Sequence, residues 1–338
     1  MAKKTNLSTI ASSTGYSVST VSRVLNGKGA TNRIPKEVCT KIKAEADRLG
    51  YTPNIIAKNL RMGKTQTIGL VVPYLSNPYF ANIASVIIAE ARNMGYTTIV
   101  SDSMESPDME RESIKALLSR KVDGLIVVPC GTEKEYLEQI NERFVPIMLV
   151  DRYFEDSRLP YVVSNNFQGG LDATNILIRN GHKRIVCIQG PPAATPNKKR
   201  IEGYRKALRD ARLQEYERIV GNEFSIQNGY LETKLLLNAK EKPTAIFALS
   251  NTIGLGTIKA IREAGLNIPE DISLISFDNN LYLDFTIPPI TRIGQKVDEM
   301  GKLAIKLLYD CLINEKRITS QIELSPEVIL RDSVAPLI

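Results

Sequence analysis

Several residue types and sequence patterns are scarce in this chain, and each absence narrows its function. Tryptophan is absent, aromatic residues make up 6% of the 338 residues, and histidine occurs once. An aromatic-rich carbohydrate-binding or membrane-facing surface is therefore not implied. The four cysteines lie far apart in sequence, at Cys39, Cys130, Cys187 and Cys311. This spacing excludes a metal or redox motif and predicts four reduced thiols, mostly packed as small hydrophobic side chains.

Targeting segments are also missing. The first ten residues, MAKKTNLSTI, carry charge but no apolar core, so they do not resemble a secretory signal. No stretch approaches the roughly 20 apolar residues of a membrane-spanning helix. We therefore expect a cytoplasmic protein.

Motifs of catalysis are not found either. The sequence has no GxSxG turn, no phosphate-binding P-loop, no GxGxxG after the first expected strand and no histidine-rich cluster. The carboxylates are scattered without a motif, and His182 lies in a loop string that we interpret as structural. We expect no catalytic residue, no metal site and no cofactor.

Charge is unevenly distributed along the chain. Residues 1–64 contain 12 Lys and Arg against 3 Asp and Glu, whereas the remainder contains 32 against 34. A small basic segment on a near-neutral body is typical of a protein that binds the phosphate backbone of a nucleic acid. From composition alone, a merely solvated basic surface remains an alternative.

Three short helices are expected in the basic segment. The first contains Leu7, Ile10 and Ala11 on one face, with Thr5 or Asn6 as its cap. The second spans residues 18–26, begins behind Ser17 after the break at Gly15-Tyr16, and ends at Gly27 and Gly29. A third runs from about Pro35 to Leu49. Two short helices joined by a tight turn form the helix-turn-helix pattern, and the second helix buries Val21, Val24 and Leu25.

From residue 68 onward the pattern changes to short Val- and Ile-rich runs that alternate with helical segments. Strands are expected at 68–73, 97–102, 123–129, 146–151, 184–189, 244–250 and 272–278. Runs that are apolar on both faces indicate parallel strands covered by helices, hence an α/β fold with right-handed crossovers. Several runs end in a polar residue, namely Asp102, Asp151, Ser250 and Asp278. Such sheets bind ligands at the carboxyl ends of their strands.

The string IASSTGYSVSTVSRVLNGKG, followed by RLGYTPNIIAKNLR, resembles the lac-repressor/galactose-repressor family. The resemblance extends over essentially the whole chain. It implies a small all-α helix-turn-helix head over residues 1–50, a hinge helix and linker over 51–64, and an effector-binding and dimerisation domain over 65–338. The implied function is a bacterial transcription regulator, a repressor by the habit of the family, whose affinity for operator DNA is controlled by a small molecule.

The resemblance assigns DNA-binding roles to the second helix. Val18, Ser19 and Arg23 would face base edges in the major groove, where an arginine suits a guanine and a valine suits a thymine methyl group. Thr20, Ser22 and Asn26 would contact phosphates. For Thr20 and Ser22, a role in satisfying the helix backbone remains the alternative. The third helix departs from the family, which usually has a Ser or Thr cap where this chain has Ile34-Pro35; this change should affect capping rather than base reading.

Residues 54–61, NIIAKNLR, match the hinge of the family, which folds only on DNA, as a dimer, in the minor groove. Asn54, Ala57 and Leu60 would contact DNA there, with Leu60 as the apolar wedge that opens a base step. An ordinary linker is the alternative. We expect Leu60→Ala to weaken specific binding far more than non-specific binding, measured on operator and random duplexes. Equal losses on both duplexes would refute the wedge.

The body resembles the effector domain of the family, which is periplasmic-binding-protein-like. Matching strings include NPYF at 77–80 and NGHKRI at 180–185. Two subdomains with parallel sheets are implied, the first about 65–162 and 292–324, the second about 163–291 and 325–338. The chain would cross between them near 162–164, 290–293 and 323–326.

The effector would bind between these subdomains. The residues implied are Tyr79, Phe80, Arg152, Asn165, Arg200, Asn251, Asp278 and Gln295. Sugar hydroxyls need paired donors and acceptors together with an apolar face. Asp278 could instead cap a helix, and Asn251 the helix that follows it. Asn165 stands where Asp is frequent and Ser250-Asn251 where Asn-Asp is frequent, so the identity of the sugar stays open.

The expected partners are operator DNA, an effector that we expect to be a sugar of carbohydrate metabolism, and a second copy of the chain. A homodimer would bind a pseudo-palindromic site at the bacterial nucleoid. Because the C-terminal sequence EVILRDSVAPLI has no leucine heptads, we expect a dimer rather than a tetramer. A secreted or periplasmic sugar-binding protein without DNA binding is the alternative function, and the basic head argues against it.

Overall fold

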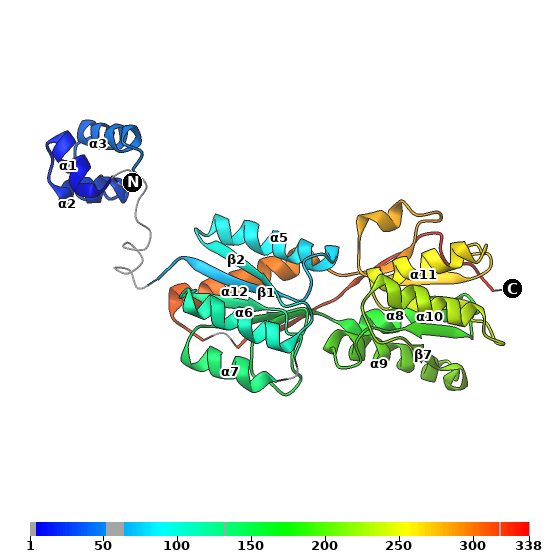
Figure 1. The fold of residues 1–338 in the computed structure, drawn as a ribbon. Coiled ribbons are helices and arrows are strands. Elements are labelled where there is room, and N and C mark those ends of the chain that lie inside the picture. The colour runs from blue at the N-terminus through cyan, green and yellow to red at the C-terminus, as the bar shows by residue number, and fades with distance from the viewer. Residues whose placement is uncertain (1–4, 52–63, 132, 318, 338) are drawn as a thin grey trace. The chain divides into compact units, whose positions relative to one another are not determined.

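The computed structural model describes residues 5–51, 64–131, 133–317 and 319–337. They belong to two compact units, residues 1–65 and 66–338, which are called the head and the body below (Figure 1). No helix among these residues is long and apolar enough to cross a membrane. The four cysteines are free thiols, of which Cys187 is buried and the other three are partly exposed.

The head consists of three helices, α1 (Leu7–Thr14), α2 (Val18–Leu25) and α3 (Lys36–Arg48). Asn6 caps α1 by accepting from the Thr9 amide, whereas Thr5, the other candidate, donates to the Leu49 carbonyl. Ser17 caps α2, as predicted. Pro35 precedes α3 and makes no side-chain cap, in agreement with the departure noted in the sequence.

A small apolar core holds these three helices together. Ile10, Val21, Val24, Ile42 and Ala46 are buried in it, with at most 3% of each residue exposed. Leu25 packs against this core and is only partly buried. The turn between α1 and α2 needs Gly15, because its φ of +79° lies in the left-handed region that side chains disfavour. This turn lets α2 pack against α1 through Val21 and Val24 while its polar face stays exposed.

The first lobe of the body is a fully parallel sheet of six strands in the order β11-β5-β4-β3-β1-β2. Helices α5 and α12 cover one face and α6 and α7 the other (Figure 1). Its elements are β1 (Thr67–Val72), α5 (Pro78–Asn93), β2 (Thr97–Asp102), α6 (Pro107–Ser119), β3 (Gly124–Val127), α7 (Lys134–Arg143), β4 (Ile147–Val150), β5 (Tyr161–Ser164), α12 (Val297–Asn314) and β11 (Gln321–Leu324).

The second lobe repeats this topology, with strand order β12-β10-β9-β8-β6-β7. Helices α8 and α9 cover one face and α10 and α11 the other. Its elements are α8 (Asn166–Arg179), β6 (Ile185–Ile188), α9 (Thr195–Asp210), η1 (Gln214–Tyr216), β7 (Arg218–Val220), α10 (Ile226–Leu237), β8 (Ala245–Ala248), α11 (Asn251–Glu263), β9 (Ser273–Phe277), η2 (Leu281–Asp284), β10 (Thr291–Gly294) and β12 (Glu327–Ile329). Strand β12 is antiparallel, so this sheet is not wholly parallel.

All seven predicted strands are present, and the chain crosses between the lobes three times. The predicted subdomain boundaries at 162/163 and 291/292 are slightly wrong, because each falls inside a strand. The crossings follow Ser164 at the end of β5 and Gly294 at the end of β10, and the third joins β11 to β12. A strand ends where its hydrogen-bonded neighbour in the sheet ends. The ends of β5 and β10 therefore could not be located from the pattern of apolar residues.

His182 has a structural position, in agreement with the sequence interpretation. Its ring nitrogens lie 3.1 Å from Thr244 Oγ1 and 3.1 Å from the Ala335 carbonyl, and the residue is 3% exposed. Burial lowers the pKa of the imidazole. The side chain therefore ties the C-terminal segment to the second lobe.

Candidate DNA-reading helix and effector cleft

Helix α2 presents a polar face opposite its buried one. Val18 is 44% exposed, and Ser19 and Arg23 are also exposed, whereas Val21 and Val24 are buried. Arg23 forms no ion pair with any of the described residues, so its guanidinium is available to an external acceptor. The three residues predicted to read bases thus share one accessible surface.

The three predicted phosphate contacts are engaged locally. Thr20 Oγ1 lies 2.9 Å from the Ser17 hydroxyl, and Asn26 donates from Nδ2 to the Ser22 carbonyl at 2.7 Å. The Thr20 and Asn26 side chains therefore contact the two ends of α2, and phosphate binding by Thr20, Ser22 and Asn26 stays a prediction. Asn54, Ala57 and Leu60 lie outside the described residues.

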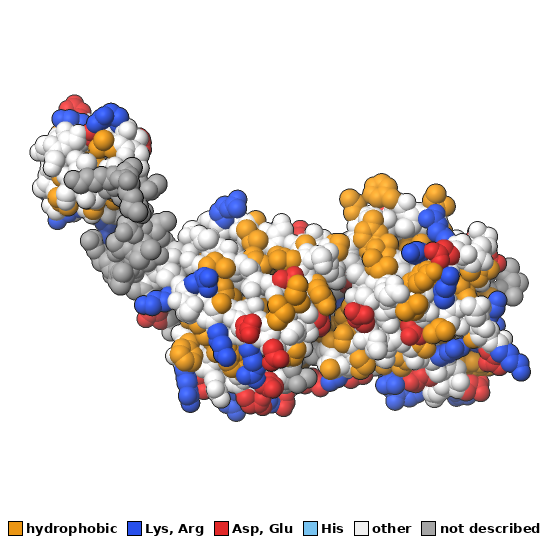
Figure 2. All heavy atoms as spheres, in the orientation of Figure 1, with side chains coloured by type: hydrophobic (Ala, Val, Ile, Leu, Met, Phe, Trp, Pro, Cys, Tyr) orange, Lys and Arg blue, Asp and Glu red, His pale blue; other side chains and the backbone are white. Residues whose placement is uncertain are grey.

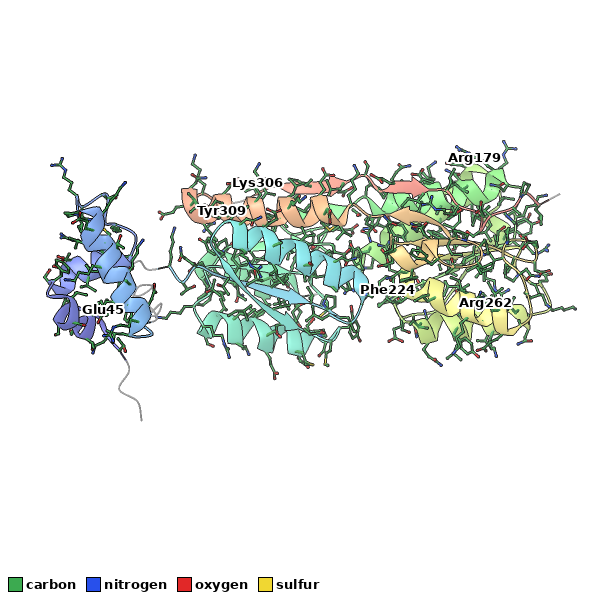
Figure 3. The ribbon with its side chains drawn as sticks, turned by 90° about the horizontal axis from the view of Figure 1, so that it is seen from above. Glu45, Arg179, Phe224, Arg262, Lys306 and Tyr309 are labelled. Carbon is green, nitrogen blue, oxygen red and sulfur yellow. The ribbon has the colours of Figure 1, made fainter. Side chains whose placement is uncertain are left out.

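In the body, the carboxyl ends of strands from both lobes meet around a small cavity of about 20 Å³. Phe224 lies at the junction of the lobes (Figure 3). Six of the eight predicted effector residues line the cavity, and the full lining is Asn77, Tyr79, Phe80, Asp151, Arg152, Pro196, Arg200, Phe224, Ser250, Asp278 and Gln295. The chain's own polar side chains thus converge between the lobes.

These side chains form a bridge across the cleft. The Tyr79 hydroxyl of the first lobe lies 2.5 Å from Asp151 Oδ1 and 3.0 Å from Gln295 Oε1. Gln295, on the crossing after β10, donates from Nε2 to Asp278 Oδ1 of the second lobe at 2.7 Å. All four residues are at most 6% exposed. Burial raises the pKa of Asp151, and burial with the nearby carboxylates raises that of Tyr79.

Both aspartates of the bridge follow buried strands in the left-handed conformation, Asp151 at φ +67° after β4 and Asp278 at φ +75° after β9. This backbone turns the carboxylate back towards the cleft, and Asp and Asn tolerate it better than most residues. Asp278 also accepts from the Asn251 amide at 3.1 Å, at the start of α11. The capping role and the cleft position therefore occur together.

Two buried arginines supply the cations of the cleft. Arg152 binds Glu105 with both terminal nitrogens, and its Cζ lies 5.9 Å from the centre of the Phe80 ring. Arg200 donates from Nε to Asn166 Oδ1 at 2.8 Å and stacks 3.6 Å above Phe277. Burial lowers the pKa of Arg200.

Two family models match this chain. That of bacterial regulatory proteins of the lacI family covers residues 6–54, and that of the periplasmic binding protein-like domain covers residues 174–334. The HTH-type transcriptional repressor PurR of Actinobacillus pleuropneumoniae serotype 3 is 32% identical over 331 residues, which are 97% of this chain and 98% of PurR.

This chain belongs to the lacI family of bacterial regulatory proteins. It is a DNA-binding transcriptional repressor with a periplasmic-binding-protein-like effector domain, and the relatives it matches are regulators rather than enzymes.

Solved structures agree with this fold. The lac repressor dimer bound to operator and the anti-inducer ONPF superimposes with a TM-score of 0.89 at 24% identity, covering 98% of this chain and all of that one. A LacI family transcriptional regulator from Enterococcus faecium with bound ribose has a TM-score of 0.73 at 29% identity, covering 80% of this chain and 99% of that one.

Two predicted effector residues of this lacI-family protein do not line the cavity. Asn165 caps α8, accepting from the Gln168 amide at 2.9 Å, and the next residue, Asn166, faces Arg200 instead. Asn251 is fully buried in the first turn of α11, and its Nδ2 lies 3.4 Å from Asn77 Oδ1 of the other lobe. The cap of α11 is Ser250 rather than Asn251.

Sequence reasoning missed five of the lining residues, namely Asn77, Asp151, Pro196, Phe224 and Ser250. Asp151 carried a usable signal, because it ends an apolar strand in the same way as Asp278. Asn77 caps α5 and is the first residue of the NPYF string that matches the family, so it also carried a signal. Phe224 had no signal, since it follows β7, a three-residue strand with little burial.

Removing the hydroxyl of Tyr79 should destabilise the body. In Tyr79→Phe the buried Asp151 carboxylate loses its 2.5 Å partner, so we expect a loss of about 1–3 kcal/mol in the free energy of unfolding. Urea denaturation measures it. Tyr309→Phe is the control, because the Tyr309 ring only packs edge-on against Tyr96 on the first lobe (Figure 3). Equal losses in the two variants would contradict the bridge.

Proposed function

We propose that this repressor acts in the bacterial cytoplasm as a homodimer that binds a pseudo-palindromic operator and is controlled by a sugar or sugar derivative in the cleft. The observation that carries the proposal is the polar bridge from Asp151 through Tyr79 and Gln295 to Asp278. It joins both lobes through groups that an effector would also use. A ligand that replaces the bridge changes the energy of lobe closure, and so biases one arrangement of the lobes over another.

DNA reading is assigned to α2. Val18, Ser19 and Arg23 present one apolar and two polar groups on its exposed face. In the major groove an arginine donates to O6 and N7 of guanine, and a valine covers a thymine methyl group. Residues 54–61 would enter the adjoining minor groove. We propose that effector binding acts on this hinge segment.

An apolar patch on the body supports the proposal that the chain forms a homodimer. Leu281, Phe285 and Ile287, in and after η2, are 74%, 77% and 81% exposed. Figure 2 shows apolar side chains gathered at this end of the second lobe. Apolar side chains grouped on a surface typically mark a protein interface. A two-fold dimer pairs identical patches, and it would offer two heads to two half-sites.

The effector class follows from the cleft lining. Asp151, Asp278, Arg200 and Gln295 provide acceptors and donors close together, which suits a ring bearing several hydroxyl groups. Phe80 and Phe224 provide aromatic faces in the same lining. These faces favour a second candidate, a planar heterocycle such as a purine base.

The test is reciprocal coupling. Operator affinity is measured by fluorescence anisotropy with and without each member of a panel of sugars and purine bases. Binding of the active compound is then measured by calorimetry with and without operator. Linkage requires the same factor in both directions. The proposal is wrong if compounds that bind the body leave operator affinity unchanged, or if the active dimer proves to be a tetramer at micromolar concentration.

A further inference from the structure

The cleft contains more space beside the polar bridge than within it. The cavity around the bridge has only about 20 Å³, which is room for roughly one water molecule. A second chamber of about 310 Å³ lies next to it, and Arg152 lines both. Chambers of roughly 300 Å³ and more hold small-molecule ligands. The second chamber, called the α9 chamber here, has the size of such a site.

The α9 chamber is formed by both lobes. The first lobe contributes Glu105, residues 129–131 and residues 152–156, and the second contributes Pro191, residues 193–195 and Lys198. Two contacts join the lobes beside it. Thr195 donates from Oγ1 to the Tyr153 carbonyl at 2.6 Å, and Lys199 pairs with Glu155 at 2.5 Å. A ligand here would contact both lobes, as an effector that controls their arrangement must.

The carboxylates of the lining are already neutralised. Glu105 pairs with Arg152, Glu155 with Lys199, and Asp156 with Lys134. Lys198 also lines the chamber and pairs with no carboxylate among the described residues. Lys198 is therefore the cation of the lining that keeps no ion-pair partner among the described residues.

The N-terminus of α9 lies at the same part of the chamber as Lys198. Helix α9 has 16 residues, its first turn contains no acidic residue, and no side chain caps it. Thr195 and Lys198, both in that turn, line the chamber. Pro196 has no amide hydrogen and the Lys198 amide donates to the Ala194 carbonyl, so the amides of Thr195 and Asn197, together with the helix dipole, are the groups that favour an anion here.

A buried donor points independently to a ligand. The Arg152 side chain is 5% exposed, and its Nε–H has no hydrogen-bond partner among the described residues. The nearest carboxylate oxygen, Asp151 Oδ2, is 3.8 Å away, beyond hydrogen-bond distance. Buried donors in proteins are nearly always paired, so this one fits an acceptor on a bound molecule.

We propose that the effector carries an anionic group, phosphate or carboxylate, on a small polyhydroxylated body, and that it binds in the α9 chamber. Lys198 and the first amides of α9 hold the anion, and a hydroxyl of the ligand accepts from Arg152 Nε–H. This inference rests on the proposed function, because it names the effector of the same cleft. It places the anionic end of that effector on the α9 side of Arg152, next to the polar bridge.

Matched pairs of ligands test the proposal on the full-length protein. Calorimetry compares ribose with ribose 5-phosphate, glucose with glucose 6-phosphate, and glucose with glucuronate. A charge-assisted contact that the neutral member lacks should make the anionic member of an active pair at least ~10-fold tighter. The phosphate and carboxylate arms show which anion is preferred. Inorganic phosphate, followed by the melting temperature, probes the anion site alone.

Variants assign the contact. Lys198→Gln should weaken the anionic member about 10-fold and leave the neutral member unchanged. Lys206→Gln is the control, since Lys206 lies further along α9 and pairs with Asp210. The control should bind both members like the unmodified protein.

The proposal is overturned if the neutral members bind as tightly as the anionic ones, or if Lys198→Gln and Lys206→Gln behave alike. It is equally overturned if none of the anionic sugars binds and inorganic phosphate changes the melting temperatures of Lys198→Gln and of the unmodified protein by the same amount. Neutral sugars or purines that bind and shift operator affinity would refute the anionic effector alone. Failure of the proposed function would appear separately, as an operator affinity that no bound compound changes.

Discussion

Arg23→Ala is expected to lower affinity for the operator by about 1–3 kcal/mol, which is roughly 5- to 150-fold. Arg23 lies on the exposed face of α2, opposite the buried Val21 and Val24, and has no ion-pair partner among the described residues. Its removal should leave the head folded, because no core contact is lost. Anisotropy with operator and random duplexes measures the effect.

The control for Arg23→Ala is Lys43→Ala, which removes one positive charge from the exposed surface of α3. Loss of a charge weakens binding to all sequences about equally, whereas loss of a base contact acts on the operator alone. Arg23→Ala should therefore reduce the ratio of operator to random affinity, and Lys43→Ala should not. Parallel losses on both duplexes in both variants would contradict base reading by α2.

Asp284→Ala should cost about 3–5 kcal/mol of folding free energy, because it leaves a buried cation without its partner. Arg292 is 2% exposed and binds Asp284 with both terminal nitrogens, at 3.0 and 2.7 Å. Its Nε donates to Asn279 at 2.9 Å. Chemical denaturation of the full chain measures the loss.

Arg331→Ala is the matched control for Asp284→Ala. Arg331 donates to the same carboxylate at 2.7 Å, but its side chain is 39% exposed. Exposed ion pairs contribute little, so this variant should lose no more than about 1 kcal/mol. If Arg331→Ala costs as much as Asp284→Ala, burial of Arg292 is not the cause.

The effect of Asp284 should depend on pH. Hydrogen bonds from Arg292 and Arg331 lower its pKa from 3.8 to about 2. A lowered pKa in the folded state means that the stabilisation is complete above the unfolded value and disappears as the pH falls through the folded one. The stability difference between the unmodified protein and Asp284→Ala should thus be constant above about pH 5 and shrink towards pH 2.

The sequence was sufficient to predict seven strands, because runs such as IGLVV and TAIFA are apolar on both faces. The buried strands β5 and β10 were missed, since each has only four residues and β10 contains the polar Thr291 and Arg292. Strands β7, β11 and β12 were missed for a different reason: they lie at the sheet edges, are three or four residues long and are only partly buried. Edge strands are fixed by ladder partners from distant segments, and local patterning carries little of that information.

The candidate site was predictable where residue type and strand position agreed, as for Tyr79, Arg200 and Asp278. The prediction was wrong by one residue at Asn165. The side chain of Asn165 caps α8, and its neighbour Asn166 is the residue that binds Arg200. The close packing of α8 against α9 decides whether Asn165 or Asn166 faces the cleft. A Cβ atom on Gly170 would lie 2.2 Å from the Arg200 carbonyl, so only glycine permits this spacing. The small volume of the central cavity and the presence of the neighbouring chamber depend on such packing, which local sequence patterns do not reveal.

The most direct test of the account is selection of bound duplexes from a random DNA pool at near-physiological salt, with the unmodified protein and Arg23→Ala side by side. The unmodified protein should enrich an inverted repeat with a deformable central step, and Arg23→Ala should lose the preference at one symmetric pair of positions. If the folded protein enriches no sequence, with or without pooled sugars, sugar phosphates and purine bases, operator reading by the head is contradicted.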